Sequence, residues 1–537
     1  MPKFDAEYDY IVLGAGSAGC VVANRLSARS DLRVLLLEAG PKDRNPWIHI
    51  PVGYYRTMND PSINWGYATE ATPQTEGRVF DWPRAKVLGG CSSMNGLVYA
   101  RGQAEDFHHW RQLGCTGWGY DDVLPYFRRA EGAAMDGLDE GYHGTEGPLG
   151  VARACAHPLC DAYIEAAGQA GIPANPDYNG ETQEGAGYFH VTTRNGWRSS
   201  AATAYLRPAR GRANLLIQTK SHVRRLMIES GRVVGVEVDR RGRAKTYGAR
   251  REVVLCAGAV NSPQILQLSG IGDGSFLTTL GIEVVHHLPE VGENLQDHFT
   301  CNSRYRCTQP MTVNDEVSNL PRKMGAAWQW LHKGTGPMSL AAGQVGVFAK
   351  TRAEYTTADV QLHFMRYSAA KRGGKLDPYP GFTVSMCQLR PESRGHVRIA
   401  SGDPLAKPTI QPNYLAAPRD REVMVAGLQL VRKVASQPAL RDYIAEELAP
   451  GLEVANADEL LAFVRAKGSS IFHPSSTCRM GCDDASVVDP RLKVRGIDGL
   501  RIADASIMPT IVSGNTNAAC IMIGEKAADM ILEDFAA

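Results

Sequence analysis

The sequence has almost no net charge, because its 537 residues carry 58 lysines and arginines against 57 aspartates and glutamates. Proteins that bind nucleic acid usually show a basic excess or patch, so this balance argues against such a partner. No uninterrupted run of 18 apolar residues occurs, and we therefore expect no transmembrane helix. The N-terminus lacks a basic segment followed by an apolar one, which predicts no signal peptide and a cytoplasmic protein, with membrane contact at most peripheral.

The twelve cysteines contain no CxxC pair. The closest pairs, Cys155 with Cys160 and Cys478 with Cys482, do not have the spacing of a standard zinc site. Others lie in apolar stretches, as Cys20 does, which is more typical of buried reduced thiols than of a disulfide framework. We therefore expect no metal site.

Glycine is more frequent than in an average protein, with 55 residues, and the excess falls in a few clusters. The first cluster follows a short apolar run, Tyr8–Leu13, which predicts a buried strand. A helix to about Ser27 and a second strand over Arg33–Leu37 follow it. The order of strand, glycines, helix and strand is a βαβ unit with a dinucleotide-binding fingerprint. The fingerprint residues are Gly14, Gly16, Ser17, Ala18 and Gly19, with Glu38 and Ala39 at the end of the second strand.

Each position in this fingerprint has a physical role. Gly14 allows the tight turn, Gly16 lets a pyrophosphate approach the backbone, and Gly19 lets the helix pack closely on the strand. The helix N-terminus offers unpaired N–H groups and a partial positive charge to phosphates. Glu38 suits hydrogen bonding to ribose hydroxyls. The unit therefore predicts FAD or NAD without separating the two.

Three further clusters of small residues follow. The second, at 88–96, contains Gly90, Asn95 and Gly96 and would let a flat ring lie against the backbone, although any tight loop has a similar composition. The third, at 256–263, follows a predicted strand and leads into a predicted helix. The fourth is VGENLQDH at 291–298.

The C-terminal region contains the residues best suited to catalysis. His473 is a candidate general base, because imidazole exchanges protons near neutral pH, and a buried histidine bonded to the backbone is the alternative. Asn515 lies where a predicted helix begins, so either Asn515 or Asn517 is a candidate helix cap. Such a helix N-terminus, aimed at a cofactor, would stabilise negative charge on it.

Jointly these motifs resemble the glucose–methanol–choline (GMC) family of FAD-dependent oxidoreductases over essentially the full chain. The motifs are GAGSAG with Glu38, AKVLGGCSSMNGLVY at 85–99, GAVNSPQILQLSGIG at 258–272, VGENLQDH, HPSSTCRMG at 473–481 and DASIMPTIVSGNTN at 504–517. Within the family the chain is most similar to bacterial alcohol dehydrogenases of the choline, sorbose and polyethylene-glycol dehydrogenase type.

The resemblance implies an α/β fold, α+β overall. We expect an FAD-binding, Rossmann-like βαβ domain and a substrate domain with a mostly antiparallel sheet flanked by helices. The FAD-binding domain is predicted from residues 1–155, 210–308 and 470–537. The substrate domain is predicted from residues 156–209 and 309–469.

The resemblance also implies the reaction, in which an alcohol loses its hydroxyl proton and passes its α-hydrogen as hydride to flavin N5, giving an aldehyde or ketone. His473 matches the family's active-site histidine, as base or as hydrogen-bonding orienter, and Asn515 matches its partner, which would hold the substrate oxygen. Further cofactor contacts are expected as follows: Val87, Gly90, Asn95, Gly96 and Val98 near the flavin, Val223 at the adenine, Ala257 along the FAD path, Asp504 and Ala505 beside the ribityl-pyrophosphate, and Asn515 and Thr516 at the pyrimidine edge.

Some members of the family tether FAD covalently through a histidine in the second cluster. Met94 stands at that position here, so we expect non-covalent FAD. The candidate substrate-pocket residues are Trp65, Phe364, Tyr367 and Phe472. They favour an uncharged or aromatic alcohol slightly over a cationic one, although aromatic side chains also bind quaternary ammonium groups.

Several alternatives stay open at this stage. The enzyme could be an oxidase that uses O₂ for the same chemistry, a non-redox lyase on the same scaffold, an NAD-dependent dehydrogenase, or a cofactor-bound interaction protein without catalysis. The electron acceptor could be a quinone, an electron carrier or O₂, and the predicted absence of a signal peptide favours a cytoplasmic or membrane-peripheral one. The sequence does not specify an oligomeric state.

Overall fold

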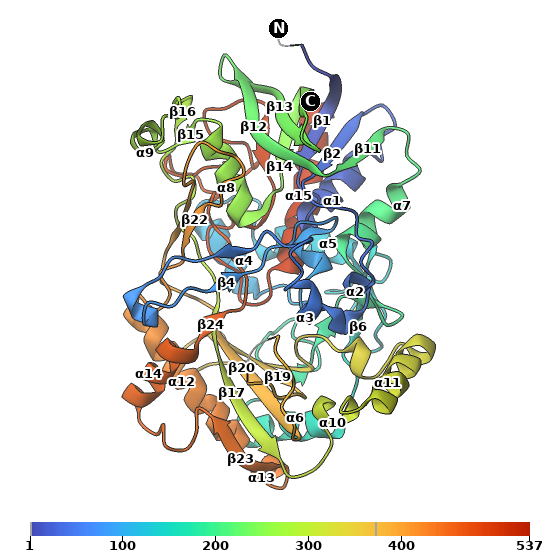
Figure 1. Cartoon of the computed structure of the whole chain (residues 1–537), viewed down its shortest axis with the longest axis vertical. Coiled ribbons are helices and arrows are strands. Elements are labelled where there is room, and N and C mark those ends of the chain that lie inside the picture. The colour runs from blue at the N-terminus through green and yellow to red at the C-terminus, as the bar shows by residue number, and fades with distance from the viewer. Residues whose placement is uncertain (1–2, 371–372, 537) are drawn as a thin grey trace.

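The computed structural model describes residues 3–370 and 373–536. Its centre consists of two seven-stranded sheets, one in each half of the molecule. In Figure 1 the first sheet lies in the upper half, near both termini, and the second lies in the lower half.

The first sheet is built around the predicted βαβ unit. Strands β1 and β2 are parallel, as predicted, and β11, β14 and β25 join them in parallel. Strands β12 and β13 extend the sheet as an antiparallel hairpin next to β14. The spatial order is β11 (Leu215–Thr219), β2 (Val34–Glu38), β1 (Ala6–Leu13), β14 (Ala244–Leu255), β13 (Arg232–Arg240) and β12 (Ser221–Glu229), with β25 (Leu500–Ile502) beside β14.

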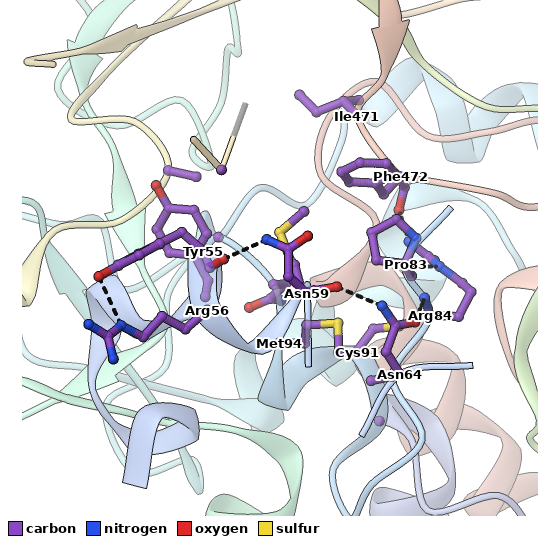
Figure 2. Close-up of a pocket in the computed structure, with 18 of the residues that line it drawn as sticks. Tyr55, Arg56, Asn59, Asn64, Pro83, Arg84, Cys91, Met94, Ile471 and Phe472 are labelled. Carbon is purple, nitrogen blue, oxygen red and sulfur yellow. Dashed lines mark hydrogen bonds between the residues drawn. The ribbon is translucent and has the colours of Figure 1, made fainter. Parts of the chain in front are cut away.

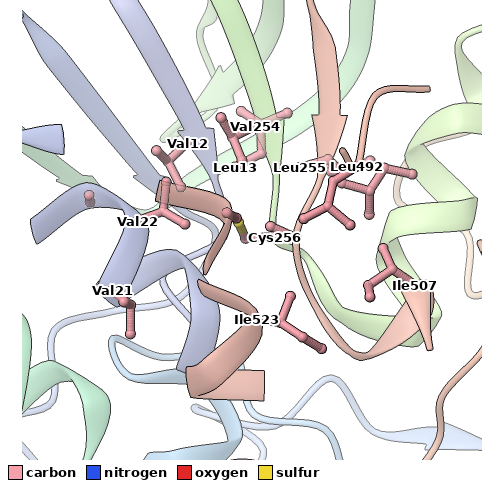
Figure 3. Packing of buried hydrophobic residues seen from close by; sticks show 14 of the residues in the cluster. Val12, Leu13, Val21, Val22, Val254, Leu255, Cys256, Leu492, Ile507 and Ile523 are labelled. Carbon is pink, nitrogen blue, oxygen red and sulfur yellow. The ribbon is translucent and has the colours of Figure 1, made fainter. Parts of the chain in front are cut away.

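Two helices from opposite ends of the chain pack together against this sheet. They are α1 (Ser17–Leu26) and α15 (Asn517–Ala536). Figure 3 shows their side chains, such as Val22 and Ile523, meeting Leu13 of β1 and Leu255 of β14 in one core. The burial of these apolar side chains fixes the N-terminus of α1 at the carboxyl edge of the sheet.

The second sheet is antiparallel throughout, which confirms the predicted type of sheet. Helices α6 (Pro158–Gln169) and α12 (Pro418–Ala435) pack against it. Its order is β23 (Ile444–Ala449), β17 (Phe299–Cys307), β20 (Gly381–Gln388), β19 (Val360–Met365), β18 (Val345–Ala349) and β7 (Gly185–Tyr188), with β24 (Ser469–Ser470) beside β17.

The division into two domains stays a prediction, and the position of β17 bears on where the boundary between them lies. Strand β17 falls in the segment 210–308 that we expected in the FAD-binding domain, yet it pairs with β20 in the second sheet. The segment 156–209, which ends with α7 (Arg207–Ala209), was expected in the substrate domain. Its short helix 202–206 nevertheless packs against α1, beside the first sheet.

The remaining helices and strands lie outside the two large sheets and the four helices described above. The helices are α2 (Pro46–His49), α3 (Tyr54–Thr57), α4 (Ala104–Gln112), α5 (Tyr120–Ala130), α8 (Gly258–Leu268), α9 (Gly274–Thr279), α10 (Val313–Glu316), α11 (Leu320–Lys333), α13 (Pro438–Arg441) and α14 (Ala457–Lys467). The strands are β3 (Tyr67–Ala68), β4 (Asp81–Trp82), β5 (Glu131–Ala133), β6 (Leu149–Arg153), β8 (His190–Val191), β9 (Thr193–Arg194), β10 (Trp197–Arg198), β15 (Ile271–Gly272), β16 (His286–His287), β21 (His396–Arg398) and β22 (Thr409–Gln411).

Candidate active site

A cavity of about 2120 Å³ is lined by residues from both halves of the molecule. A pocket for one small molecule usually has a volume of about 300–1000 Å³. The cavity therefore has room for a dinucleotide together with a second, smaller ligand.

Most of the residues predicted to bind FAD line this cavity. Three loops meet there, and only glycine lets them approach so closely. A Cβ atom on Gly14 would lie 2.6 Å from the carbonyl oxygen of Cys256, and one on Gly90 would lie 2.6 Å from the Cα of Gly16. The lining members are Gly14, Gly16, Ser17, Ala18, Glu38, Ala39, Gly90, Asn95, Gly96, Val98, Val223, Ala257, Asp504, Ala505, Asn515 and Thr516.

Polar groups at this end of the cavity fit the parts of a dinucleotide. Helix α1 has no side-chain cap, since Gly16 occupies its N-cap position, so its first N–H groups face a ligand-sized space. Glu38 accepts hydrogen bonds from the N–H groups of Ala15 (3.0 Å) and Gly40 (2.7 Å), and burial raises its pKa to about 7. Asp504 accepts a hydrogen bond from the N–H of Gly258 (2.8 Å) and so holds the start of α8.

Two predicted cofactor residues lie outside the lining. A Cβ on Gly19 would lie 1.9 Å from the carbonyl oxygen of Gly14, so this glycine serves the close packing of helix on strand, as predicted. The side chain of Val87 is fully buried in a small apolar cluster with Ile48 and Met94. Its expected position near the flavin stays a prediction.

His473 lies on a tight loop that is fixed by the buried carboxylate of Asp297. Its N–H donates to Oδ1 of Asp297 (2.6 Å), and Oδ2 of Asp297 accepts from the hydroxyls of Ser470 (2.5 Å) and Tyr414. The preceding residue, Phe472, has a φ of 69°, a left-handed conformation that is rare for a bulky side chain. The bonds to Asp297 keep this strained loop, and with it the imidazole, in place.

A chain of hydrogen bonds fixes which nitrogen of His473 carries a proton. Nδ1 of His473 lies 3.0 Å from Nδ1 of His298, and Nε2 of His298 lies 3.1 Å from the carbonyl oxygen of Leu389. A carbonyl only accepts, so Nε2 of His298 donates. Burial lowers the pKa of His298 to about 4, so the ring is neutral and its Nδ1 carries a lone pair. His473 must then donate from Nδ1, and in the neutral ring Nε2 is the acceptor.

The contacts on the other side of the ring agree with this assignment. The Oδ1 atom of Asn515 accepts a hydrogen bond from Nε2 of Gln361 (3.2 Å). Its Nδ2 atom therefore faces Nε2 of His473, at 3.2 Å, and donates to it. Two contacts thus assign the lone pair of the neutral His473 ring to Nε2, where the amide of Asn515 occupies it in this structure.

The loop that carries Asn515 is fixed by a second buried carboxylate. Asp106 accepts hydrogen bonds from the N–H (2.6 Å) and the hydroxyl (2.8 Å) of Ser513. Helix α15 begins at Asn517, whose Oδ1 accepts from the hydroxyl of Ser17 (2.7 Å). The Asn515 side chain points to His473 instead of capping the helix.

The predicted substrate residues fall into three groups. Tyr367 and Phe472 line the cavity, and Figure 2 shows Phe472 across from Tyr55 and Asn59. Trp65 also lines the cavity, but its ring stacks on Tyr67 and has the Lys86 ammonium 4.4 Å from its centroid.

The prediction for Phe364 is wrong. Its ring is fully buried behind the second sheet, where it stacks on Tyr163 with the centroids 4.3 Å apart. Successive side chains of a strand point to opposite faces. The neighbours of Phe364 on β19, His363 and Met365, therefore line the cavity in its place.

Sequence reasoning missed three residues that act on the catalytic pair, namely Asp297, His298 and Gln361. The first two end the VGENLQDH motif directly before β17, so their position in the fourth cluster, beside a strand, was a usable signal. Gln361 gave no signal, because a glutamine within an apolar strand has no distinctive pattern.

The structure also bears on metals, thiols and membranes. Within residues 3–370 and 373–536, no group of histidine, cysteine and acidic side chains has an arrangement that would hold a metal ion. All twelve cysteines are free thiols, and eight of them are buried. Among the described helices, none combines the length and the apolar character needed to cross a membrane.

Comparison with known proteins shows what the chain is similar to. The GMC oxidoreductase family matches residues 8–300, and its C-terminal part matches residues 391–524. Human mitochondrial choline dehydrogenase is 44% identical over 98% of this chain and 90% of its own length. The alcohol dehydrogenase (acceptor) of Pseudomonas putida is 41% identical over 98% and 96%. A solved structure of Aspergillus oryzae RIB40 formate oxidase, from work on FAD modification in that enzyme, matches with a TM-score of 0.93. The two chains are 25% identical, and the match covers 100% of each.

Proposed function

The chain belongs to the GMC oxidoreductase family and is an FAD-dependent enzyme that oxidises CH–OH groups, and on this premise we propose that His473 and Asn515 form its catalytic pair. The observation that supports the pair is the distance of 3.2 Å between Nε2 of His473 and the amide nitrogen of Asn515, two residues that line the cavity. An alcohol oxygen that displaces this bond and enters between the two groups would donate its proton to Nε2 and accept from the amide.

In the proposed mechanism, FAD supplies the hydride acceptor when it is bound. His473 accepts the hydroxyl proton of the alcohol at Nε2 and becomes an imidazolium. Its Nδ1–H then donates to neutral His298, a bond that strengthens when the donor is charged. Asn515 donates from Nδ2 to the substrate oxygen, and Gln361 keeps the amide in that orientation.

We propose that FAD is bound without a covalent link. Met94 lines the cavity in the second glycine cluster, and a thioether does not replace the imidazole that tethers FAD in some members of the family. The glycine cradle and Glu38 offer the dinucleotide a binding site that needs no tether.

We further propose an uncharged alcohol as the substrate. Apart from Glu38 and Asp504 at the dinucleotide end, the acidic lining residues within the described ranges are Asp81, Asp315 and Asp377. Asp377 lies 3.2 Å from the guanidinium of Arg304, and Asp315 accepts from the N–H of Thr312 (3.1 Å). Asp377 is thus neutralised by Arg304, Asp81 is exposed to solvent, and the charge of Asp315 already serves the N-terminus of α10. A quaternary ammonium group would therefore find little free counter-charge to offset its desolvation, which is costly.

In the test, the purified protein is mixed anaerobically with a panel of alcohols, and the loss of flavin absorbance is measured. The panel includes choline and 3,3-dimethylbutan-1-ol, which has the same shape as choline without its charge. We expect the neutral alcohol to reduce the flavin with the higher second-order rate constant.

A higher rate constant for choline would refute the uncharged substrate and leave the catalytic pair intact. If no alcohol of the panel reduced the flavin, the proposed dehydrogenase would be wrong. Turnover of a substrate without loss of flavin absorbance would favour the lyase alternative instead.

A further inference from the structure

The cavity wall formed by the second sheet carries a row of polar side chains. Asn302 of β17 is the register partner of Ser385 on β20, and Ser385 is in turn the partner of His363 on β19. All three line the cavity, and Thr383, two residues before Ser385, lines it as well. Figure 1 shows these three strands beside one another in the lower half of the molecule.

A short chain of hydrogen bonds fixes the proton of the Ser385 hydroxyl. The Thr300 hydroxyl lies 2.8 Å from the carbonyl oxygen of Met386, which can only accept, so Thr300 donates to it. The Oγ atom of Ser385 lies 2.8 Å from the same Thr300 hydroxyl. Since the one proton of Thr300 is already used, Ser385 must donate to Thr300. The lone pairs that remain on Ser385 are therefore available to the cavity.

Two further groups of this wall also offer acceptors to the cavity. The Thr383 hydroxyl donates to the carbonyl oxygen of Tyr367 (2.9 Å), which leaves the lone pairs of its oxygen. The Oδ1 atom of Asn302 is buried and accepts no hydrogen bond from any residue that the structure describes. A buried acceptor without a donor is costly, and a ligand that donates to it removes this cost. We call Asn302, Thr383 and Ser385 the acceptor row.

The strand geometry places the acceptor row at a set distance from the catalytic pair. Gln361, which bonds to Asn515, precedes His363 by two residues on β19. Two residues of a strand advance by about 7 Å, so Ser385, the register partner of His363, lies about that far along the sheet from Gln361. An alcohol whose oxygen contacts Asn515 would reach the acceptor row with an atom several carbons away.

Resting on the proposed function, we infer that the acceptor row selects linear diols, in which a second hydroxyl lies several carbons from the one that is oxidised. The second hydroxyl donates to Oδ1 of Asn302 or to Oγ of Ser385, while the first lies between His473 and Asn515. An uncharged diol meets this requirement and needs no counter-charge from the cavity wall. A simple aliphatic alcohol would instead place a methyl group against the unfilled acceptors.

The test compares three alcohols in anaerobic stopped-flow reduction of the FAD-loaded protein. They are 1,5-pentanediol, hexan-1-ol, in which a methyl group replaces the second hydroxyl, and 5-methoxypentan-1-ol, in which the second oxygen carries no proton. We expect the diol to reduce the flavin with a second-order rate constant about tenfold above the other two, after correction for its two equivalent ends. The reason is that only the diol donates to the acceptor row.

A double variant assigns this preference to the acceptor row. Asn302→Leu/Ser385→Ala removes two of the three acceptors, so the preference for the diol should fall about tenfold. Its rate constant with hexan-1-ol should rise, because fewer buried acceptors then face the methyl group. The matched control is Ser303→Ala, since Ser303 is buried beside Asn302 on β17 but lies outside the cavity lining. The control should keep the wild-type preference.

The outcomes separate this inference from the proposed function. Equal rate constants for the three alcohols in the wild type would overturn the inference alone, and this comparison needs no variant to fold. A preference for the diol that the double variant keeps would also overturn it. So would a methyl ether that reacts as fast as the diol, because the wall would then donate to the second oxygen. If none of the three alcohols reduced the flavin, the proposed function would fail and the inference with it.

Discussion

The role of His298 gives the sharpest test of the site. It has no direct contact with the cavity, but it accepts the Nδ1 proton of His473 and so keeps Nε2 of that ring unprotonated. Replacing His298 with leucine removes the acceptor and leaves the Nδ1–H of His473 buried without it. The ring then gains by moving its proton to Nε2, which abolishes the base.

The magnitude follows from the cost of that lost acceptor. Leaving one buried donor unsatisfied costs about 1–3 kcal/mol. If the competent tautomer of His473 is disfavoured by this amount, the rate constant of flavin reduction falls about 5- to 150-fold. The carbonyl of Leu389 loses its donor in the same variant, so the free energy of unfolding should fall by a similar amount. Substrate affinity should change little, because His298 does not line the cavity.

The assay is anaerobic stopped-flow reduction of the bound flavin at saturating alcohol, with thermal unfolding measured in parallel. His298→Asn keeps an acceptor near the Nδ1 position and should recover part of the rate. His190→Leu is the matched control, since His190 is also buried with a pKa lowered to about 4 but contacts Asn179 instead of the catalytic pair. Our reasoning is refuted if His298→Leu is destabilised like His190→Leu and still reduces the flavin at the wild-type rate.

Two further predictions concern the catalytic base and the cofactor. The His473→Ala variant should bind FAD normally but reduce it about 10²–10⁴ times more slowly, as expected for loss of a general base, and stopped-flow reduction would show this. An unchanged rate would remove His473 from the mechanism. Acid precipitation of the purified protein should release all the yellow flavin into the supernatant, because Met94 cannot hold it covalently. Flavin that stays with the pellet would contradict this and direct a search for another attachment residue.

The sequence predicted the first sheet well because its signals are local. An apolar run, a glycine turn and an amphipathic helix follow one another within β1, α1 and β2, and the structure confirms each of them. The position of β17 was harder to predict. Nothing within a strand states which of two sheets it pairs with, since that depends on β20, which lies about 80 residues later.

Site residues were predictable where they belong to a sequence motif. They were unpredictable where the face of a strand determines whether a side chain reaches the cavity. His473 and Asn515 each lie in a recognisable motif, and the structure brings them into contact. Phe364 was misassigned because aromatic character alone does not tell which face of β19 a side chain occupies. The phase of the alternation is set by packing against Tyr163, which is distant in the sequence.

The hydrogen bonds that select the proton-accepting nitrogen both originate in the second sheet. Gln361 lies on β19 and is the register partner of Cys387 on β20, and Leu389 follows two residues later. Gln361 acts on His473 through Asn515, and Leu389 acts on it through His298. The catalytic pair itself is held from elsewhere, by Asp297 and Asp106. A shift of these two strands relative to the catalytic loops would therefore break both constraints at once. The second sheet thus sets the protonation of the base as well as the shape of the substrate space, so changes to its cavity face affect rate and specificity together.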